Sequence, residues 1–371
     1  MKKKTLKQLE ILGQSIWLDY IRRDLMTSGE LHRLIEMDGL RGLTSNPAIF
    51  EKAIVTSRDY DADIQSLHAQ GNDAREIYEA ISQRDVQSAA DEFRPLYDRT
   101  DGADGYVSLE VSPRLAHDTQ ATLEEARRLW VALKRPNVLI KIPATTEGLP
   151  VIQQLITEGI NVNVTLLFGM PRYQQVVDAY LAGLEARAAL GQPLQRVASV
   201  ASFFLSRIDA MVDPLLENLA AQGGQDADRA RQVRGLVAIA SAKLAYQVYK
   251  EIYASDRFQK LAAQGARSQR LLWASTGTKN PDYSDVKYID ALIGMDTVNT
   301  APLETINAYR DHGDPKPRLD ENIQEAAWVL DQLGKMGIRI VQMTQRLEDD
   351  GVERFNLPFD KLMANLTERI Q

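Results

Sequence analysis

A lysine stands in the middle of a stretch that otherwise has the composition of a buried strand. Residues 137–144 read Asn-Val-Leu-Ile-Lys-Ile-Pro-Ala, with Lys141 near the centre. A lysine is almost never fully buried without a reason. An inward-facing amine loses hydration, which favours the neutral form, and a neutral amine can attack a ketone to form a Schiff base. We expect Lys141 to be such a nucleophile; the alternatives are a structural ion pair with Glu110 or Asp19, or a charge that protects a sheet edge.

Two carboxylates end other strand-like segments. Asp19 lies near the end of segment 15–21, and Glu110 lies near the end of segment 105–111. Two carboxylates beside an amine can divide acid and base catalysis between them when their surroundings differ. Taken singly, each fits the cap of a loop or the partner of a nearby arginine at least as well.

Segment 160–168 alternates between polar and apolar residues. Because side chains of a strand point to its two faces in turn, Asn161, Asn163, Thr165 and Leu167 are predicted to share one face. The opposite face carries only apolar residues, at positions 162, 164, 166 and 168. In a barrel the apolar face meets the helices, so Asn163 and Thr165 are predicted to point toward the axis. The alternative is a polar barrel layer satisfied by internal hydrogen bonds or water.

A basic and hydroxyl-rich group of residues follows two later strands. Arg207 comes after segment 197–204, and Ser275-Thr-Gly-Thr-Lys279 comes at the end of segment 270–276. Loops after the late strands of α/β barrels often bind phosphate, and the guanidinium fork of arginine matches phosphate geometry. We expect a phosphate site here, with a solvated charged loop as the alternative for Lys279.

No metal or nucleotide cofactor is expected. The four histidines are isolated and show no ligand spacing: His32, His68, His117 and His312. The sequence has no phosphate-binding P-loop motif, and no Gly-x-Gly-x-x-Gly follows a predicted strand.

Strands that alternate with helices position these residues. Alternation of this kind favours parallel βαβ units, and eight of them favour a closed (β/α)8 TIM barrel in which active sites form at the C-terminal ends of the strands. We predict one domain over residues 1–371, with additional N-terminal helices and a helical C-terminal extension over about 303–371. The predicted strands are 15–21, 39–46, 105–111, 137–144, 160–168, 197–204, 270–276 and 296–300.

Composition narrows the class of protein. The 371 residues include no cysteine, 44% are hydrophobic and 26% are charged, which is typical of a soluble globular protein. The absence of cysteine removes disulfides and thiolate chemistry and suits a reducing cytoplasm. The net charge of −7 argues against nucleic acid or an anionic membrane as partner. We expect a cytoplasmic protein whose partners are small molecules, as a monomer or a homodimer.

The ordered set of motifs resembles transaldolases, which are class I aldolases on a (β/α)8 barrel. The resemblance spans about residues 15–300 and is closest to the longer bacterial-type members. Two departures concern the late strands: Ser202-Phe-Phe204 replaces a Ser-Pro-Phe, and Thr-Gly-Thr precedes Lys279 where short members place an arginine. The matching stretches are Trp17–Asp19, Gly42–Pro47, Val107–Ser112, Ile140–Ala144, Asn161–Phe168, Ala201–Arg207 and Trp273–Pro281.

The resemblance implies a role for each of these residues. Lys141 is then the Schiff-base lysine, Asp19 acts on the C4 hydroxyl, and Glu110 works through a water near Thr165. Dihydroxyacetone hydroxyls are then held by Asn46, Asn163 and Ser202, and Phe204 lines the site. Arg207 and Ser275 are then the phosphate ligands. Lys279 adds a point charge to this site rather than a fork of donors.

The implied activity is transfer of a three-carbon dihydroxyacetone unit from a ketose phosphate to an aldose phosphate, without cofactor, in the non-oxidative pentose phosphate pathway. One alternative is a fructose-6-phosphate aldolase, a shorter lyase of the same superfamily that carries glutamine and tyrosine where this chain has Glu110 and Phe204. A second is a glycosidase that uses Asp19 and Glu110. A third is a sugar-phosphate-binding barrel without catalysis.

Overall fold

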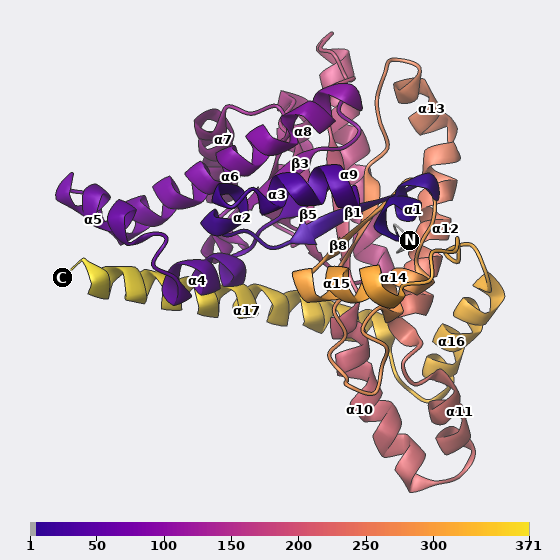
Figure 1. Ribbon diagram of the computed structural model, residues 1–371. Coiled ribbons are helices and arrows are strands. Elements are labelled where there is room, and N and C mark those ends of the chain that lie inside the picture. Colours follow the sequence, from indigo (N-terminus) through magenta and orange to yellow (C-terminus); the bar gives the residue numbers. More distant parts are fainter. Residues whose placement is uncertain (1–4, 371) are drawn as a thin grey trace.

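Eight parallel strands form a closed barrel in the computed structural model, which describes residues 5–370 (Figure 1). Each strand pairs with the next along the chain, and the last pairs with the first. The predicted (β/α)8 barrel is therefore confirmed. The strands are β1 (Gln14–Asp19), β2 (Gly42–Thr44), β3 (Tyr106–Glu110), β4 (Val138–Pro143), β5 (Val162–Leu167), β6 (Ser199–Phe204), β7 (Arg270–Ala274) and β8 (Thr297–Ala301).

Helices follow most strands and enclose the barrel. Up to β5 they are α1 (Thr5–Ile11), α2 (Arg23–Thr27), α3 (Glu30–Arg33), the π-helix η1 (Leu34–Asp38), α4 (Pro47–Thr56), α5 (Asp61–Ala69), α6 (Ala74–Arg99), the 3₁₀-helix η2 (Pro113–Leu115), α7 (Thr119–Leu133) and α8 (Gly148–Glu158). After β5 they are α9 (Met170–Ala189), α10 (Ser206–Gln222), α11 (Gln225–Val233), α12 (Val237–Ala254), α13 (Asp256–Ala262), α14 (Lys287–Ala291), α15 (Leu303–His312), α16 (Ile323–Lys335) and α17 (Ile340–Arg369).

The interior of the barrel is filled from its N-terminal end by aromatic side chains. The rings of Trp17 and Tyr106 lie 6.4 Å apart. Gly42 is directly beside Trp17, where a Cβ atom would lie 2.6 Å from the indole. A glycine is therefore required on β2 for the indole to occupy the axis.

Strand β5 departs from the predicted alternation at its end. Val164 pairs with Ala201 and Leu167 pairs with Phe203, so β5 uses one residue more than β6 over this interval. Leu166 takes up the extra residue as a β-bulge, with a left-handed backbone φ of 57°. Leu167 therefore lies on the face of Val164, and its predicted place on the face of Asn163 and Thr165 is wrong.

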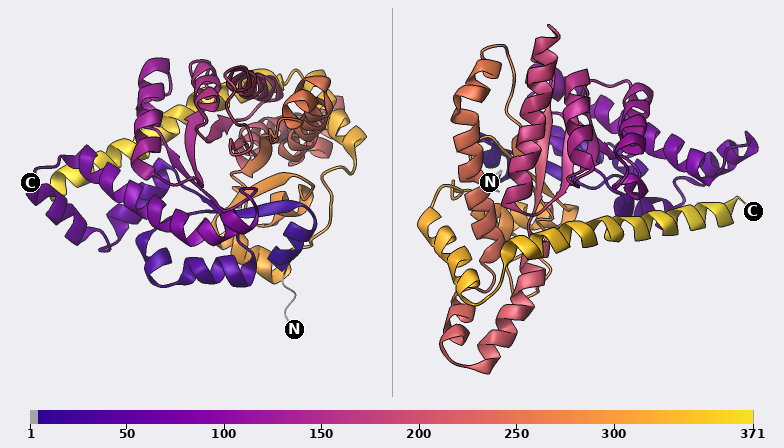
Figure 2. Two further views of the ribbon diagram at one scale, coloured as in Figure 1. Left: turned by 90° about the horizontal axis from the view of Figure 1, so that it is seen from above. Right: turned by 180° about the vertical axis from the view of Figure 1, so that it is seen from behind.

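The C-terminal extension is helical, as predicted, and its last helix crosses the barrel. In Figures 1 and 2, α17 runs from the side of α10 and α16 to the side of α4 and α5, and it contacts α4, α6, β5 and α10. The one-domain prediction includes residues 1–4 and 371, which lie outside the described residues. Within residues 5–370, no helix is long and apolar enough to cross a membrane.

Candidate active site

A cavity of about 150 Å³ opens at the C-terminal ends of the strands. Every strand except β3 contributes to it directly or through the loop that follows, and α17 contributes Phe355. Most of the predicted site residues line it: Asp19, Asn46, Lys141, Thr165, Ser202, Phe204, Arg207, Ser275 and Lys279. Glu110 and Asn163 do not line it but contact side chains that do.

Lys141 lies on β4 between the neighbouring strands β3 and β5. It pairs with Glu110 on one side and with Asn163 on the other, and it is 4% exposed. A position inside a closed barrel excludes the alternative that it protects a sheet edge. Its Nζ atom donates to the backbone oxygen of Ser45 at 3.1 Å and reaches into the cavity.

The contact between Lys141 and Glu110 is looser than a structural ion pair requires. The Nζ and Oε2 atoms are 3.4 Å apart, and both side chains are buried. Glu110 Oε2 nevertheless has no hydrogen-bond partner among the described residues. A buried pair that only stabilised the fold would need its remaining hydrogen bonds satisfied. The geometry instead leaves an acid or base beside the amine.

Asp19 stands at the end of β1 in a second polar group. Thr44 Oγ1 donates to Asp19 Oδ1 at 2.7 Å and lies 2.8 Å from Thr300 Oγ1. Burial raises the pKa of Asp19, and the positive charge of Lys141 and the Thr44 hydrogen bond oppose this. Burial likewise raises the pKa of Glu110 against the attraction of Lys141. Raised values bring both carboxyls closer to the range in which they can exchange protons.

Polar side chains from three strands form a chain behind the lysine. Asn163 Nδ2 donates to Ser108 Oγ at 3.0 Å, and Ser202 Oγ donates to Asn163 Oδ1 at 2.7 Å. These bonds fix the orientation of Asn163. Thr165 Oγ1 is buried and has no hydrogen-bond partner among residues 5–370. The inward direction predicted for Asn163 and Thr165 is therefore correct, and Thr165 keeps a free hydroxyl at the cavity.

Asn46 lines the cavity and also caps a helix. Its side-chain oxygen accepts from the backbone N–H of Ile49 at 3.0 Å, which caps α4. Pro47 follows at the first helical position, where its missing N–H costs nothing. The cap fixes the carbonyl side of the amide and leaves the NH₂ group as the part that can serve a ligand.

The predicted phosphate residues meet at the other side of the cavity. Arg207 is partly buried, and its Nη1 atom has no hydrogen-bond partner in the described part of the chain. Burial, followed by the positive charge of Arg354, holds the pKa of Arg207 below its ordinary value. Ser275 has a left-handed backbone, with φ of 55°, and its Oγ lies 2.9 Å from Ser206 Oγ. Lys279 lines the same cavity.

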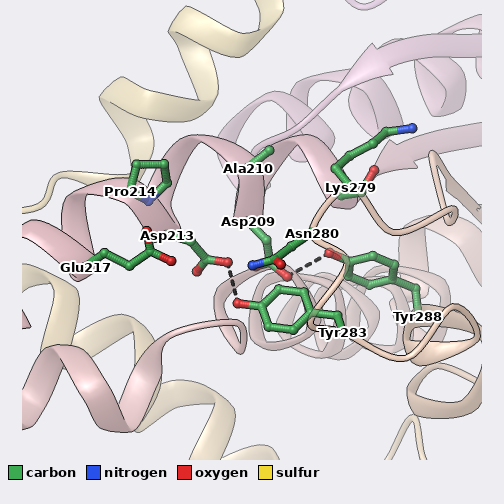
Figure 3. A pocket seen from close by; sticks show the side chains of 10 residues that line it. Asp209, Ala210, Asp213, Pro214, Glu217, Lys279, Asn280, Tyr283 and Tyr288 are labelled. Carbon is green, nitrogen blue, oxygen red and sulfur yellow. Dashed lines mark hydrogen bonds between the residues drawn. The ribbon is translucent and has the colours of Figure 1, made fainter.

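Two acidic residues on α10 anchor the loop that bears Lys279. Asp213 accepts from the Tyr283 hydroxyl at 2.6 Å, and Asp209 accepts from the Tyr288 hydroxyl at 2.8 Å. Figure 3 shows these bonds in a second pocket, with Lys279 at its edge and its amine pointing away from the two carboxylates. The loop after β7 is thus tied to the helix that begins beside Arg207.

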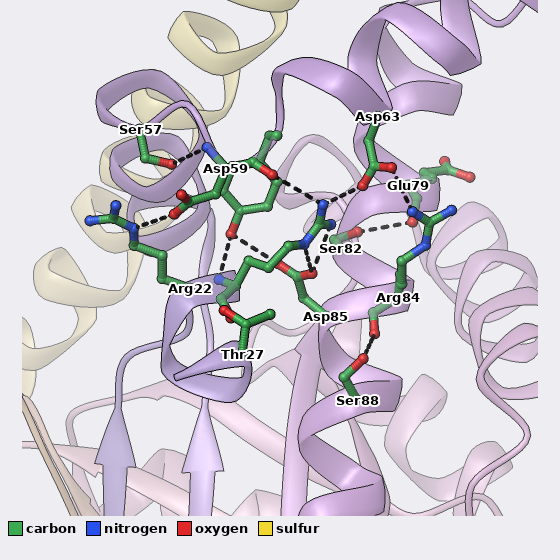
Figure 4. A network of polar contacts seen from close by, with 12 residues as sticks. Arg22, Thr27, Ser57, Asp59, Asp63, Glu79, Ser82, Arg84, Asp85 and Ser88 are labelled. Atoms are coloured by element: carbon green, nitrogen blue, oxygen red, sulfur yellow. Dashed lines mark hydrogen bonds and ion pairs between the residues drawn. The ribbon is translucent and has the colours of Figure 1, made fainter. Parts of the chain in front are cut away.

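A matching network anchors the loop after β1. Arg23 donates to Asp85 Oδ1 through Nη2 at 2.9 Å, and the Tyr60 hydroxyl donates to Asp85 Oδ2 at 2.9 Å. Tyr60 in turn accepts the backbone N–H of Arg23 at 3.0 Å. Figure 4 shows the network of polar contacts around Asp85. This network binds the segment that follows Asp19 to α6 and so limits movement of the strand end.

Several residues of the cavity were not predicted. Thr44 orients Asp19, and Thr300 in turn contacts Thr44. In the sequence, the only indication of these two residues was that each lies two positions before a residue marking the end of a predicted strand, Asn46 and Pro302. Phe355 lies far along the chain, and nothing in its local sequence indicates a role at the barrel. No group of three or more His, Asp or Glu suited to a metal ion occurs among the described residues.

Comparison with known proteins identifies the family of this chain. Residues 16–366 match the family described as Transaldolase/Fructose-6-phosphate aldolase. The chain is 48% identical over 370 residues to the transaldolase of Trichodesmium erythraeum, covering 99% of this chain and 97% of that protein. It is 47% identical over 360 residues to the transaldolase of Thiobacillus denitrificans, covering 97% and 99%. A transaldolase of Mycobacterium bovis is 44% identical over 360 residues, covering 96% and 95%. The chain therefore belongs to the transaldolase/fructose-6-phosphate aldolase family.

Proposed function

We propose that this chain transfers a dihydroxyacetone unit from fructose 6-phosphate or sedoheptulose 7-phosphate to an aldose phosphate, with Lys141 as the Schiff-base nucleophile. The observation that carries the proposal is the placement of Lys141. A buried amine faces a cavity, with a carboxylate 3.4 Å away and a second carboxylate among the cavity residues. The full-length similarity to curated transaldolases supports transfer.

The first half of the reaction cleaves the donor. Glu110 takes a proton from the amine of Lys141, and the neutral amine then attacks C2 of the ketose. The resulting carbinolamine loses water with the help of Glu110, which returns the proton, and of Thr165. The iminium ion then accepts the electron pair of the C3–C4 bond while Asp19 takes the proton of the C4 hydroxyl. An aldose phosphate leaves, and a three-carbon enamine stays bound to Lys141. The iminium is the electron sink of this cleavage.

The second half repeats these steps in reverse with another aldose phosphate. The enamine carbon attacks the aldehyde, and Asp19 returns its proton to the new hydroxyl. Water then attacks the iminium, and the amine of Lys141 leaves. Asn46, Asn163 and Ser202 hold the three-carbon unit between the halves, so the enamine is kept for the acceptor. Arg207, Ser275 and Lys279 bind the phosphate of each sugar.

The alternatives fit the cavity less well. A glycosidase needs the sugar between its two carboxylates, and Lys141 lies beside one of them with its amine in the cavity. A lyase of the same family is the nearer alternative. Glu110 and Phe204 stand at the two positions where the resemblance separates transfer from simple cleavage. We further propose a cytoplasmic enzyme of the non-oxidative pentose phosphate pathway, monomeric or homodimeric, with sugar phosphates as its partners.

Borohydride trapping tests the proposal. The protein is incubated with fructose 6-phosphate, reduced with borohydride and mapped by mass spectrometry, and the mass increment is expected on Lys141 alone. Lys243→Met is the matched control: Lys243 is also buried, and burial lowers its pKa. Lys243→Met should trap like the unsubstituted chain, and Lys141→Met should not trap. A label on another lysine would refute the mechanism.

Adding erythrose 4-phosphate separates transfer from cleavage. A transaldolase forms a seven-carbon ketose phosphate and releases little free dihydroxyacetone. A lyase releases dihydroxyacetone from fructose 6-phosphate without any acceptor. Dihydroxyacetone release at the rate of donor consumption would therefore replace the proposed transfer with the lyase reaction.

A further inference from the structure

The last helix of the chain supplies a wall of the active site. Phe355 of α17 is 4% exposed and lines the cavity together with Phe204 and Arg207. The other cavity residues lie on strands, in the loops directly after them or, for Arg207, in the first turn of α10, and none lies beyond Pro302. The site is therefore incomplete without a helix that is not one of the barrel's own βα units.

Close packing sets the position of α17 over β5. A Cβ atom on Gly351 would lie 3.1 Å from Leu166 and 3.5 Å from Phe168, the residues at the β5 bulge. One turn earlier in α17, Glu348 accepts from Arg172 Nε at 2.9 Å, and both side chains are largely buried. The absence of a side chain on Gly351 thus lets α17 approach the bulge closely.

An aromatic contact fixes the helix on the other side of Phe355. The ring of Phe359 lies 5.7 Å from Tyr78 of α6, which lies 5.9 Å from Phe50 of α4. Lys361 adds an ion pair to Glu51 at 2.6 Å. Phe355 is thus held between two anchored stretches of one helix and has little freedom to move.

The guanidinium of Arg207 lies close to two aromatic rings. Its Cζ atom is 5.6 Å from the centre of the Phe204 ring and 5.7 Å from the centre of the Phe355 ring. Both distances are within the range of cation–π attraction, which is stronger where the cation is desolvated. One ring comes from β6 and the other from α17, so the position of Arg207 depends on both.

Aromatic faces hold a cation without using its hydrogen-bond donors. A carboxylate partner would accept from the guanidinium fork and occupy the N–H groups that a phosphate needs. Here Nη1 of Arg207 has no partner among the described residues. The rings stabilise the charge and fix the plane, and the donors stay available. A mobile arginine side chain loses conformational entropy when it binds a phosphate. Contacts with the two rings restrict Arg207 beforehand and so reduce that loss.

We propose that Phe355 is a positioning residue: with Phe204 it holds the Arg207 guanidinium in the plane in which its free N–H groups meet the phosphate of the sugar. The role of residues 303–371 is then to complete the phosphate side of the cavity. Phe355 takes this part in catalysis only if the substrates carry the phosphate of the proposed function.

Four substitutions separate the ring from its surroundings. Phe355→Ala removes ring and volume, Phe355→Leu keeps most of the volume without the ring, and Phe355→Tyr keeps the ring. Leu366→Ala is the matched control, because it removes a buried apolar side chain from the same helix, beyond the stretch that anchors Phe355. For each variant, kcat and KM are measured with fructose 6-phosphate and erythrose 4-phosphate, and folding is checked by calorimetry.

We expect the Ala and Leu variants of Phe355 to raise KM for fructose 6-phosphate by about tenfold, with kcat within about threefold. Phe355→Tyr and Leu366→Ala should stay within about twofold in KM. Trapping of dihydroxyacetone on Lys141 should be unchanged in all four, because this ketone has no phosphate. An unchanged KM in Phe355→Leu, or an equal rise in Leu366→Ala, would overturn the role of the ring.

Calorimetric titration with inorganic phosphate tests Phe355 independently of turnover. The unsubstituted chain should bind phosphate about tenfold more tightly than Phe355→Leu and within about twofold of Phe355→Tyr. Equal affinity in Phe355→Leu overturns the inference even if the enzyme is active. A tenfold loss of phosphate affinity in Phe355→Leu, found in a protein that shows no transferase activity, would support the positioning role of Phe355. It would contradict only the proposed reaction.

Discussion

The two ends of the barrel differ in how far their charged side chains are compensated by hydrogen bonds. We call the C-terminal end with Asp19, Glu110 and Lys141 the mouth, and the N-terminal end with Asp104 and Arg270 the floor. At the mouth the amine of Lys141 is 3.4 Å from Glu110, and Glu110 Oε2 has no hydrogen-bond partner among the described residues. At the floor the ion pair between Arg270 and Asp104 is also a hydrogen bond.

The groups of the floor ion pair satisfy one another's hydrogen bonds. Arg270 donates to Asp104 Oδ1 at 3.0 Å, to Ser15 Oγ at 3.0 Å and to the backbone oxygen of Ala103 at 2.7 Å. Ser15 Oγ then donates to Asp104 Oδ2 at 3.0 Å. A buried pair with satisfied lone pairs and donors stabilises a fold, or at least does not oppose it.

The difference shows how one barrel separates stability from chemistry. The carboxyls of the mouth are desolvated without full compensation, so they have raised pKa values and free hydrogen-bonding capacity. The charges of the floor are compensated by each other and by Ser15. Active sites are often destabilising in this way, and the rest of the fold offsets the cost. Substitutions at the two ends should therefore have opposite signatures.

The largest effect is expected from Asp19→Asn at the mouth. The amide keeps the oxygen that accepts from Thr44 but cannot take the C4 proton, so turnover should fall by about 10³-fold. Schiff-base formation does not need this proton transfer, so borohydride should trap more of the six-carbon adduct on Lys141. Mass spectrometry of the trapped peptide and steady-state kinetics measure both.

Asp104→Asn is the control for that substitution, since it makes the same change at the floor. Its turnover per folded molecule should stay within about twofold of the unsubstituted chain. A comparable loss of turnover in both variants would mean that Asp19 acts through the fold and not on the substrate.

Arg270→Met at the floor should have the next largest effect, and it should change the stability of the fold without changing the chemistry at Lys141. It leaves Asp104 buried without its cation, at a cost of about 2 to 3 kcal/mol in the free energy of unfolding. Denaturant titration measures this cost, and borohydride trapping at Lys141 should be retained by the folded protein. Loss of trapping without loss of stability would contradict the division between the two ends.

The smallest effect is a pH dependence of stability. Because the pKa of Asp19 is raised in the folded protein, the folded state holds its proton to higher pH than the unfolded state. The free energy of unfolding therefore falls as pH rises from about 4 through the folded pKa.

Asp19→Asn removes this penalty. It should unfold at a higher denaturant concentration than the unsubstituted chain at pH 7. The advantage should vanish below about pH 4, where the native carboxyl is protonated in both states. Unfolding curves at several pH values measure it, and a variant that is less stable at pH 7 would show that the Asp19 charge favours folding.

The barrel and much of the site could be predicted because both follow from local patterns. Polar residues at the ends of apolar, strand-like segments meet at one end of a parallel barrel, whatever lies between them. Lys141, Asp19 and Thr165 needed only this rule. Their assigned roles came from the resemblance and stay predictions until the variants are tested.

The remainder depends on contacts that no local pattern encodes. The bulge at Leu166 places an ordinary apolar residue in a left-handed conformation, which a period of two cannot indicate. Phe355 reads as one apolar position of an amphipathic helix, and only the docking of α17 decides that it meets Arg207. The network around Asp85 also joins segments that are distant in sequence.

The pairing of β1 with β8 has a consequence for the synthesis of the chain. Gln14 donates to Thr297 Oγ1 at 3.0 Å across a separation of 283 residues. Until the ribosome has added β8, β1 and β7 are open edges of an unfinished sheet, and such edges invite pairing with other chains. The nascent protein thus carries its greatest risk of aggregation just before its last strand emerges, and a chaperone would be of most use at that moment.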